Sequence, residues 1–248
     1  MPDLPPELPT ELIEALSDAR RVVALTGSGI SAESGVPTFR EAQTGLWARY
    51  DPQELATPEA FARDPELVWK WYAWRRGLVG RALPNAGHTA LADVERSVPE
   101  FCLVTQNVDG LHQQAGSDHV VELHGNLLRS RCPVENVTVE PDGADHLPPL
   151  CPNCGSPLRP DVVWFGEALP ATELEAASEA ARSCDLFLSV GTSGLVSPAA
   201  SLPYEALESR ATVVEINPDR TPLSPHADFS LRGRAEEILP LLVGATFG

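Results

Sequence analysis

The fold of this chain is limited first by a glycine-rich turn that follows a short apolar segment. Residues Arg21–Thr26 form a β-branched, apolar run of the kind that becomes a buried parallel strand. The run leads into Gly27-Ser28-Gly29-Ile30-Ser31-Ala32, which fits the G-x-G-x-x-G/A pattern of dinucleotide-binding turns. Glycines there allow a tight turn and let backbone N–H groups approach a pyrophosphate, next to a helix N-terminus that favours negative charge. Alone, the pattern fits a plain strand-to-helix turn about as well.

Strand-like and helix-like segments alternate along the rest of the chain. Further buried strands are expected at residues 101–105, 120–121, 186–190 and 212–216, and residues 161–167 are expected to resume the core. Helices are expected at about 10–20, from Asn85 onward, and at 172–182, 199–208 and 235–242. The first should be capped by Thr10, with an apolar face of Leu12, Ile13 and Leu16. This order predicts an α/β fold, a doubly wound parallel sheet of the Rossmann-like type.

Two segments interrupt the alternation and predict a smaller inserted domain. Residues 41–84 include an amphipathic helix whose apolar face is Leu67, Trp71, Trp74 and Leu78. Residues 127–159 have many prolines and a cluster of cysteines. We therefore expect one chain, 1–248, with a Rossmann-like domain at about 10–40, 85–126 and 160–248. Its small domain combines the helical insertion 41–84 with the cysteine-bearing insertion 127–159.

Composition limits the partners and the compartment. The 248 residues carry 18 Lys and Arg against 35 Asp and Glu, a formal net charge of −17. Such a surface repels nucleic acid and anionic membranes and attracts lysine-rich segments, although many proteins are acidic for solubility alone. The five cysteines are an odd number in a long chain, which favours reduced thiols over a disulfide framework. With no apolar span and no basic leader, we expect a cytoplasmic protein.

The continuation of the first turn and four later blocks give the chain a family resemblance. From about Val22 to Leu241 it resembles the sirtuins, the NAD-dependent protein-lysine deacylases, and within them the bacterial desuccinylase- and demalonylase-like class. The order and spacing of the blocks make the resemblance specific, whereas any one block alone is a weak signal. The blocks are Gly27–Arg40, Gln106–Asp109 with His112, His124-Gly125, Asp161–Glu167, and Gly191-Thr192-Ser193 with Asn217.

The resemblance implies an NAD site where the strands end. Ser28 departs from the alanine usual in the family, and the segment Glu33–Arg40, interrupted by Gly35 and Pro37, would be a mobile cover over the nucleotide. The implied NAD-binding residues are Gly27, Ser28, Gly29, Ile30, Phe39, Arg40, Gln106, Asn107, Asp109, Gly191, Thr192, Ser193, Asn217 and Ala235.

The resemblance also implies the catalytic residues, His124 and Asn107. The acyl oxygen of an acylated lysine attacks the ribose carbon as nicotinamide leaves, and His124 then deprotonates a ribose hydroxyl so that the acyl group migrates. Histidine suits this role because its ordinary pKa is about 6.5. The implied products are nicotinamide, free lysine and O-acyl-ADP-ribose. Taken alone, His124 would be a strand-end histidine bonded to the backbone, and His88 is expected to be a structural residue at a helix start.

Two segments are implied to bind the acylated substrate. The peptide would add as a strand along Val163, Phe165, Gly166 and Glu167. Tyr72 and Arg75 share a helix face by their i, i+3 spacing, and they stand where desuccinylases and demalonylases carry a Tyr-x-x-Arg pair. On an arbitrary helix the same pair would be a boundary tyrosine and a solvated arginine. The resemblance implies succinyl- and malonyl-lysine as substrates alongside acetyl-lysine.

The cysteine cluster departs from the family pattern. Sirtuins usually carry two C-x-x-C pairs on a zinc ribbon, and here Cys151 and Cys154 form one pair while Cys132 is followed by Glu135 in place of the fourth cysteine. Because zinc accepts carboxylate oxygen, a Cys3Glu site is one reading of this zinc-ribbon-like segment. Water or His146 as the fourth ligand and a metal-free ribbon are the others. In every case the role would be structural. Cys102 and Cys184 are expected to be packing residues.

Two further functions use the same NAD site. The chain could transfer ADP-ribose to a protein side chain, or it could be a non-catalytic module that senses NAD. A binding module needs no base, so His124 argues against the second. The expected partners are acylated-lysine proteins or peptides, and the protein is expected to be a monomer without direct nucleic-acid or membrane binding.

Overall fold

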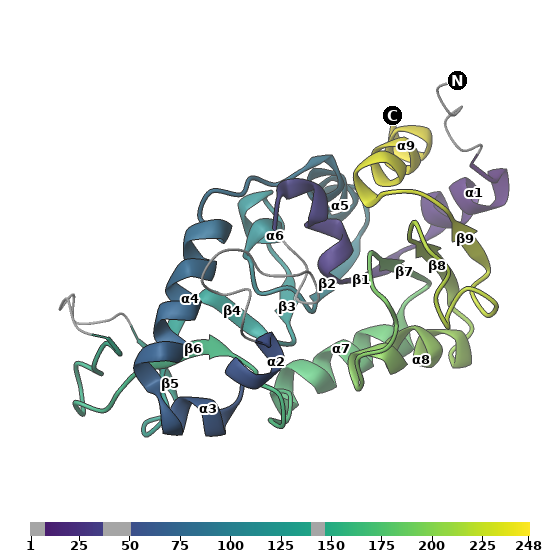
Figure 1. The fold of residues 1–248 in the computed structure, drawn as a ribbon. Helices are drawn as coiled ribbons and strands as arrows, with labels where there is room; N and C mark the ends of the chain where they lie inside the picture. The colour runs from purple at the N-terminus through teal and green to yellow at the C-terminus, as the bar shows by residue number, and fades with distance from the viewer. Residues whose placement is uncertain (1–7, 37–50, 140–146) are drawn as a thin grey trace.

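Six parallel strands form the main sheet of the computed structural model, which describes residues 8–36, 51–139 and 147–248 (Figure 1). Their order across the sheet is β3–β2–β1–β7–β8–β9. The chain therefore builds outward from β1 in one direction and from β7 in the other, which confirms the predicted doubly wound, Rossmann-like sheet. The strands are β1 (Arg21–Thr26), β2 (Glu100–Thr105), β3 (Val120–Glu122), β7 (Leu186–Val190), β8 (Thr212–Ile216) and β9 (Phe229–Leu231).

Helices cover both faces of this sheet, which explains why its central strands are apolar throughout. In β1, Val22 and Ala24 pack into one core, and Val23 and Leu25, on the opposite face, pack into the other. The first core is completed by α1 (Thr10–Asp18), α5 (Ala86–Ser97) and α9 (Ala235–Phe247). The second is completed by α7 (Ala171–Ser183) and α8 (Leu202–Glu208), on the other side of the sheet in Figure 1.

A smaller unit of helices and a second sheet packs beside the main sheet. Its helices are α2 (Pro52–Leu55), α3 (Pro58–Arg63) and α4 (Pro65–Val79), and its antiparallel sheet has the order β5–β4–β6. The strands are β4 (Gly125–Cys132), β5 (Val137–Val139) and β6 (Arg159–Val162). The Thr57 and Asp64 side chains accept the N–H groups of Ala60 and Leu67, and each cap precedes a proline, so local sequence sets the starts of α3 and α4.

One guanidinium fastens the long helix of this unit to its sheet. Arg76 donates from Nε to the carbonyl oxygen of Leu127 at 2.7 Å and from Nη2 to that of Arg129 at 2.6 Å. The apolar core beneath it includes Trp71, Leu127 and Trp164. Helix α4 is therefore fixed against β4 by both polar and apolar contacts.

Three sequence expectations about these elements are wrong. Residues 161–167 do not resume the main sheet, because β6 pairs antiparallel with β4 in the small sheet. The first turn is followed by two 3-10 turns, Ser28–Ile30 and Ala32–Ser34, rather than by an α-helix. Thr10 is the first helical residue of α1, and the cap position belongs to Pro9, which makes no side-chain cap bond.

The buried face of α4 also differs from the expected one. Its buried residues are Val68, Trp69, Trp71, Tyr72 and Val79, whereas the expected Leu67, Trp74 and Leu78 are only partly buried. The helix packs against β4 and β6 as well as α3, so a single apolar stripe does not describe it. The elements α6 (Leu111–Gln114) and β9 were not expected, because four and three residues are too short to show a period.

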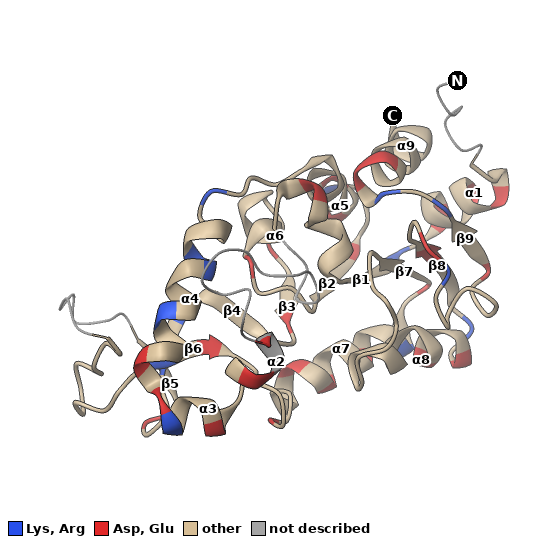
Figure 2. Ribbon diagram, in the orientation of Figure 1, with Lys and Arg blue, Asp and Glu red and all other residues tan. Residues whose placement is uncertain are grey.

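Asp and Glu positions are spread over both the main-sheet part and the small unit in Figure 2. None of the helices in the described ranges combines the length and apolar character that a membrane crossing requires.

Candidate active site

Strands β1 and β7 end in glycine turns whose backbones touch. The N–H of Gly29 donates to the carbonyl oxygen of Gly191 at 2.8 Å, and the N–H of Gly27 donates to that of Val190 at 3.1 Å. A Cβ atom on Gly29 would lie 2.7 Å from the Gly191 oxygen, so this contact excludes any side chain. The two turns lie where the strand order reverses, the place at which open α/β sheets bind ligands.

Amide and hydroxyl groups from neighbouring strand ends join these turns. Gln106, after β2, donates from Nε2 to Thr192 Oγ1 at 3.1 Å, and Asn217, after β8, donates from Nδ2 to the Thr192 carbonyl oxygen at 3.0 Å. Asn107 donates from Nδ2 to the Gly27 carbonyl oxygen at 3.0 Å. The structure thus brings predicted residues from four strand ends to one edge of the sheet.

The remaining predicted NAD-binding residues lie at different depths. Ser28 and Ser193 are exposed on the two turns, and Ile30 is buried. Ala235 is buried at the start of α9, where its backbone lies against Gly87. Phe39 and Arg40, with the second half of the expected cover (37–40), lie outside the described residues.

Ser31 is a buried hydrogen-bond centre that connects several of these groups. Its hydroxyl donates to Asp109 Oδ2 at 2.8 Å and accepts from Asn107 Nδ2 at 3.1 Å. His88 Nε2 lies 3.3 Å from the same oxygen. Burial raises the pKa of Asp109, although the bonds from Leu111 N–H and Ser31 oppose that rise. The position of Asp109 relative to Asn107 is therefore set through one hydroxyl.

Two buried histidines lie behind this edge. His88 and Asn85 form the capping box of α5. His88 therefore has a structural role at a helix start, as expected from the sequence. Burial lowers the pKa of His88 to about 4 and that of His112 to about 3. His112 Nε2 lies 2.9 Å from Thr26 Oγ1, which itself donates to Thr105, so the imidazole is the donor in that pair. Both rings are neutral near pH 7.

His124 follows β3 and is held in one tautomer. Its Nδ1 lies 2.9 Å from the backbone carbonyl oxygen of Gln106, which accepts only, so Nδ1 carries the proton and Nε2 is left as a proton acceptor. Burial lowers the pKa of His124, and the bond to Gln106 partly offsets this. The next residue, Gly125, has φ +77, and a Cβ there would lie 2.2 Å from the Asp161 carbonyl oxygen. This approach brings β6 directly behind the histidine.

The segment after β6 passes alongside His124. The N–H of Val163 donates to the His124 carbonyl oxygen, and the N–H of Phe165 donates to the Ala56 carbonyl oxygen, each at 2.9 Å. The Phe165 side chain is 46% exposed. A turn at Gly166 closes the segment, where the Glu167 N–H donates to the Trp164 carbonyl oxygen at 3.0 Å.

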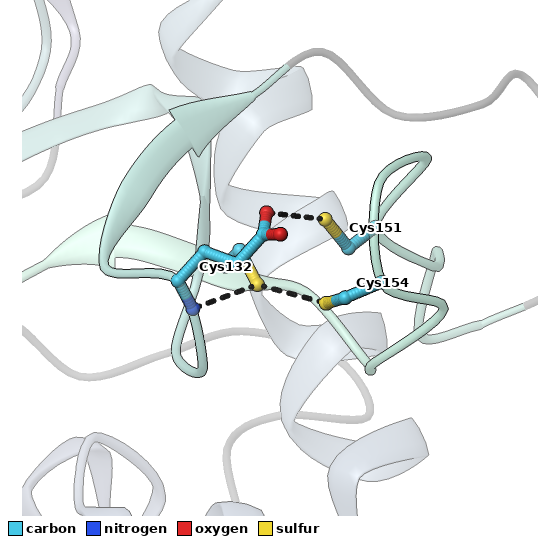
Figure 3. Close-up of side chains that lie close together, drawn as sticks. Cys132, Cys151 and Cys154 are labelled. Atoms are coloured by element: carbon cyan, nitrogen blue, oxygen red, sulfur yellow. Dashed lines mark hydrogen bonds between the residues drawn. The ribbon is translucent and has the colours of Figure 1, made fainter.

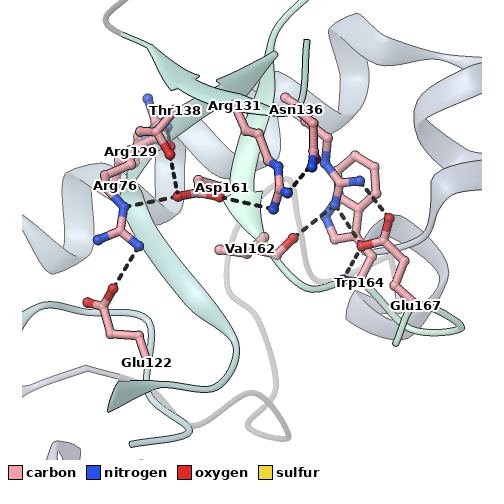
Figure 4. A network of polar contacts seen from close by, with 11 residues as sticks. Arg76, Glu122, Arg129, Arg131, Asn136, Thr138, Asp161, Val162, Trp164 and Glu167 are labelled. Atoms are coloured by element: carbon pink, nitrogen blue, oxygen red, sulfur yellow. Dashed lines mark hydrogen bonds and ion pairs between the residues drawn. The ribbon is translucent and has the colours of Figure 1, made fainter. Parts of the chain in front are cut away.

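Glu167 is bonded within its own segment. Its Oε1 and Oε2 accept from the Arg159 guanidinium at 2.6 and 2.8 Å, and Oε2 also accepts from the Trp164 N–H at 2.8 Å (Figure 4). Partial burial alone would raise the pKa of Glu167, but these hydrogen bonds together lower it. The carboxylate therefore holds the segment in shape.

Tyr72 lies inside the small unit rather than at a helix boundary. Its side chain is 4% exposed, and its hydroxyl oxygen accepts from Trp164 Nε1 at 2.8 Å. Burial raises the pKa of this phenol well above its ordinary value, so the hydroxyl stays protonated. Arg75 is partly buried, with its guanidinium carbon 5.2 Å from the centre of the Trp71 ring.

Three cysteines and one glutamate gather at the end of the small sheet. The ligand atoms of Cys132, Glu135, Cys151 and Cys154 all lie within 4.8 Å of one another (Figure 3). The sulfurs of Cys132 and Cys154 are 3.5 Å apart, and the Cys151 sulfur lies 3.6 Å from Glu135 Oε2. Tetrahedral zinc, with sulfur at about 2.3 Å, needs spacings of about this size. This set could bind a zinc ion; His146 lies outside the described residues.

Comparison with known proteins assigns the family. The profile of the Sir2 family matches residues 27–198, more than half of the chain. The chain belongs to the Sir2 family. NAD-dependent protein deacylase 1 of Archaeoglobus fulgidus is 52% identical over 235 residues, which cover 94% of this chain and 96% of that protein. The enzyme of the same name from Pseudomonas aeruginosa is 51% identical over 245 residues, 95% of this chain and 98% of that one.

Solved Sir2 structures have the same fold. A Sir2 homologue in complex with NAD superposes with a TM-score of 0.90 at 50% identity, covering 97% of this chain and 94% of that one. A Sir2 homologue mutant in complex with 2′-O-acetyl ADP-ribose gives 0.88 at 51% identity, covering 96% of each chain. The sirtuin resemblance inferred from the sequence blocks is thereby confirmed.

The structure places further side chains at the candidate site that the sequence alone does not single out. Ser31 is one position of the glycine-rich pattern, and nothing in that pattern indicates that its hydroxyl contacts Asp109. Arg159 and Trp164 were not named as site residues. Trp164 contacts Tyr72 of α4, which is far away in the sequence, and Arg159 packs on the Trp164 ring, so only the fold shows this arrangement.

Proposed function

We propose that this Sir2-family protein removes acyl groups from lysine side chains of proteins, with NAD as its co-substrate. The observation that carries the proposal is the contact between His124 and Val163. It joins the segment expected to bind the peptide to a histidine whose Nε2 is free to accept a proton. Both lie at the edge of the sheet where the nucleotide should bind. The relatives are named NAD-dependent protein deacylases, so ADP-ribosyl transfer and NAD sensing are not favoured.

The strand-end residues would bind NAD along its length. The pyrophosphate would lie against the backbone of the two glycine turns, which contact each other at Gly29 and Gly191, as in other dinucleotide sites. Thr192, Ser193 and Asn217 would hold the phosphate and the adenosine ribose. Gln106, Asn107 and Asp109 would hold the nicotinamide ribose and carboxamide. The hydrogen bonds that tie Asn107 and Asp109 to Ser31 support this, because they fix both side chains before the ligand arrives.

His124 would act as the general base. NAD supplies a ribose carbon from which nicotinamide can leave. At pH 7 the imidazole is neutral, since burial lowers its pKa, and Nε2 can take a proton from a ribose hydroxyl. The Nδ1–H bond to the Gln106 carbonyl keeps the ring oriented and stabilises the imidazolium that this transfer creates.

The acylated peptide would lie along residues 163–167. Backbone pairing there would bind many sequences with little side-chain selection, and the exposed Phe165 would cover the lysine chain. Beyond it, the hydroxyl of Tyr72 and the guanidinium of Arg75 can donate hydrogen bonds to an acyl group that ends in a carboxylate. We therefore propose succinyl- and malonyl-lysine as substrates together with acetyl-lysine.

The zinc site would be structural. Cys132, Cys151, Cys154 and Glu135 would hold the ion, which would join the end of β4 to the loop before β6. The small sheet has only three strands and a small core there, so a metal would supply stability that packing does not.

We further propose that the protein works as a monomer in the cytoplasm. All five cysteines are free thiols, as a reducing compartment favours. The acidic charge favours lysine-rich substrate segments over nucleic acid or anionic membranes. Sedimentation analysis would test the monomer.

Nicotinamide release is the deciding measurement. With NAD and an acetyl-lysine peptide, the protein should release nicotinamide and free lysine in equal amounts, and omitting the peptide should abolish both. ADP-ribose attached to a protein without loss of the acyl group would favour the transferase instead. Tight NAD binding without turnover of any acyl peptide would favour the sensing module.

A further inference from the structure

The Tyr72 hydroxyl can donate its proton only on the side that faces away from Trp164. A phenol oxygen carries one proton and two acceptor positions, and the Trp164 indole N–H occupies one acceptor position at 2.8 Å. The hydroxyl proton cannot point toward another donor, so it is directed away from the indole. Among the residues that the structure describes, none accepts that proton through a hydrogen bond.

Trp164 is clamped by the Arg159 guanidinium and by two neighbouring aromatic rings. On one face, the Arg159 guanidinium carbon lies 3.5 Å from the centre of a Trp164 ring. That guanidinium is fixed by both oxygens of Glu167 and by a 2.9 Å bond to the Val162 carbonyl oxygen (Figure 4). The other contacts are aromatic, with the Phe61 ring at 5.3 Å and the Tyr72 ring at 6.5 Å. The indole N–H therefore has a fixed position.

The clamped pair adjoins the reaction site. Tyr72 and Trp164 share one apolar cluster with Val108, which stands between Asn107 and Asp109. Trp164 also directly follows Val163, whose N–H is bonded to the His124 carbonyl oxygen. The Tyr72 hydroxyl therefore lies in the part of the small unit that packs against the candidate peptide segment and the Asn107–Asp109 loop.

We propose that Trp164 is a positioning residue for the recognition of acyl groups that end in a carboxylate. By occupying an acceptor position of the Tyr72 hydroxyl, its indole N–H aims the hydroxyl proton at the acyl carboxylate, and Arg159 with Glu167 keeps the indole in place. A donor that is aimed in advance loses no orientational freedom on binding. An acetyl group ends in a methyl and gains nothing from this arrangement. The inference rests on the proposed deacylase function and deepens its substrate class.

Trp164→Phe removes the indole N–H and keeps an aromatic ring under the Arg159 guanidinium. We expect the KM for a succinyl-lysine peptide to rise about 5-fold, the factor that corresponds to one ordinary hydrogen bond. The values for the matched acetyl-lysine peptide and for NAD should change less than 2-fold. Trp69→Phe is the matched control, since Trp69 is also buried and donates its indole N–H to the Leu158 carbonyl oxygen at 2.6 Å. It should lower stability without changing the ratio of succinyl to acetyl turnover.

A double-mutant cycle with Tyr72→Phe tests whether Trp164 acts through the hydroxyl. Once that hydroxyl is absent, adding Trp164→Phe should cause no further loss of succinyl turnover. Independent, multiplying losses would overturn the inference, as would equal losses on both peptides or the same change of ratio in Trp69→Phe. A wild-type protein active on acetyl but not succinyl peptide would overturn this inference alone. A protein that releases nicotinamide with neither peptide would overturn the proposed function, and this inference with it.

Discussion

His124 and Val163 share a backbone hydrogen bond, with the Val163 N–H donating to the His124 carbonyl oxygen at 2.9 Å. The bond joins the residue after β3 of the main sheet to the residue after β6 of the small sheet. Gly125 extends the contact, because only hydrogen fits between its Cα and the Asp161 carbonyl oxygen. The candidate base and the candidate peptide segment therefore have fixed positions relative to each other before any substrate binds.

Replacing the candidate base should abolish turnover and leave binding in place. We expect His124→Ala to lower kcat by roughly 10²- to 10⁴-fold, the usual contribution of a general base. NAD affinity, measured by calorimetry, should change little. His226→Ala, at an exposed histidine in the main-sheet part, is the control and should keep full activity. A His124→Ala protein with more than about a tenth of the wild-type rate would contradict the assignment, given that range.

The rate of deacetylation should begin to fall only at acidic pH. Because burial lowers the pKa of His124, the base stays neutral down to below its ordinary pKa of about 6.5. The rate should therefore be level near pH 7 and fall only at a pH below that ordinary histidine pKa. An acetyl peptide is the right substrate, because its acyl group does not titrate. A midpoint at or above pH 7 would show that another group controls the step.

Stability should fall on mild acidification. The pKa values of His88 and His112 are depressed in the folded protein to about 4 and about 3, so the unfolded chain binds more protons between those values and about pH 6.5. Their stabilising contribution is complete above pH 6.5 and is lost as the pH falls through that window. We expect the free energy of unfolding to drop by about 2–4 kcal/mol between pH 7.5 and 5, with the raised pKa of Asp109 opposing part of this.

Urea titrations at several pH values measure that loss. His112→Gln should flatten the dependence, because a glutamine cannot take up the proton. His226→Gln should leave the slope as it is. If the wild-type curve were flat between pH 7.5 and 5, the two buried rings would not be neutral in the way described.

Replacing Arg75, the candidate carboxylate-binding arginine, should slow desuccinylation much more than deacetylation. A charge-assisted hydrogen bond contributes about 1.5–3 kcal/mol, or roughly 10- to 150-fold in kcat/KM. Arg75→Met keeps most of the aliphatic chain and should lower desuccinylation by about that factor, with far less effect on deacetylation. Arg81→Met, at an exposed arginine just beyond α4, is the matched control. Equal losses on both substrates would make Arg75 an ordinary packing residue.

Metal content should identify the fourth ligand. Protein purified without a histidine tag should contain about one zinc per chain. If Glu135 is a ligand, Glu135→Ala should weaken zinc binding by about 10-fold or more in competition with a chelator, and Glu135→Cys should tighten it. Cys184→Ala, outside the cluster, should change stability but not zinc content. A folded, active sample with well under one zinc per chain would show that the ribbon stands without metal.

The main sheet was predictable because its signals are local. Strands β1, β7 and β8 are short apolar runs ending at Gly27, Gly191 and Asn217, and burial on both faces forces that composition. The start of α5 was equally clear from Asn85 and His88. The residues expected at the strand ends are brought to one edge because parallel strands all end on the same side.

What could not be predicted depends on contacts between distant segments. β6 looks like one more buried strand, and only its pairing with β4 assigns it to the small sheet. Tyr72 stood beside the expected apolar stripe of α4, yet Trp164 and Trp71 cover it. No sequence period encodes a clamp such as Arg159 with Glu167, because its geometry appears only when the turn at Gly166 closes.

The contact between Gly29 and Gly191 has a consequence for the lifetime of the protein in a cell. Its two partners come from opposite halves of the chain, so the surface offered to NAD exists only when folding is complete. A ligand that binds only the folded state adds about 2.7 kcal/mol of stability at one hundred times its dissociation constant. Chains with bound nucleotide should then resist proteolysis longer than empty ones. The steady-state amount of this enzyme, and not only its rate, is therefore expected to follow the NAD supply.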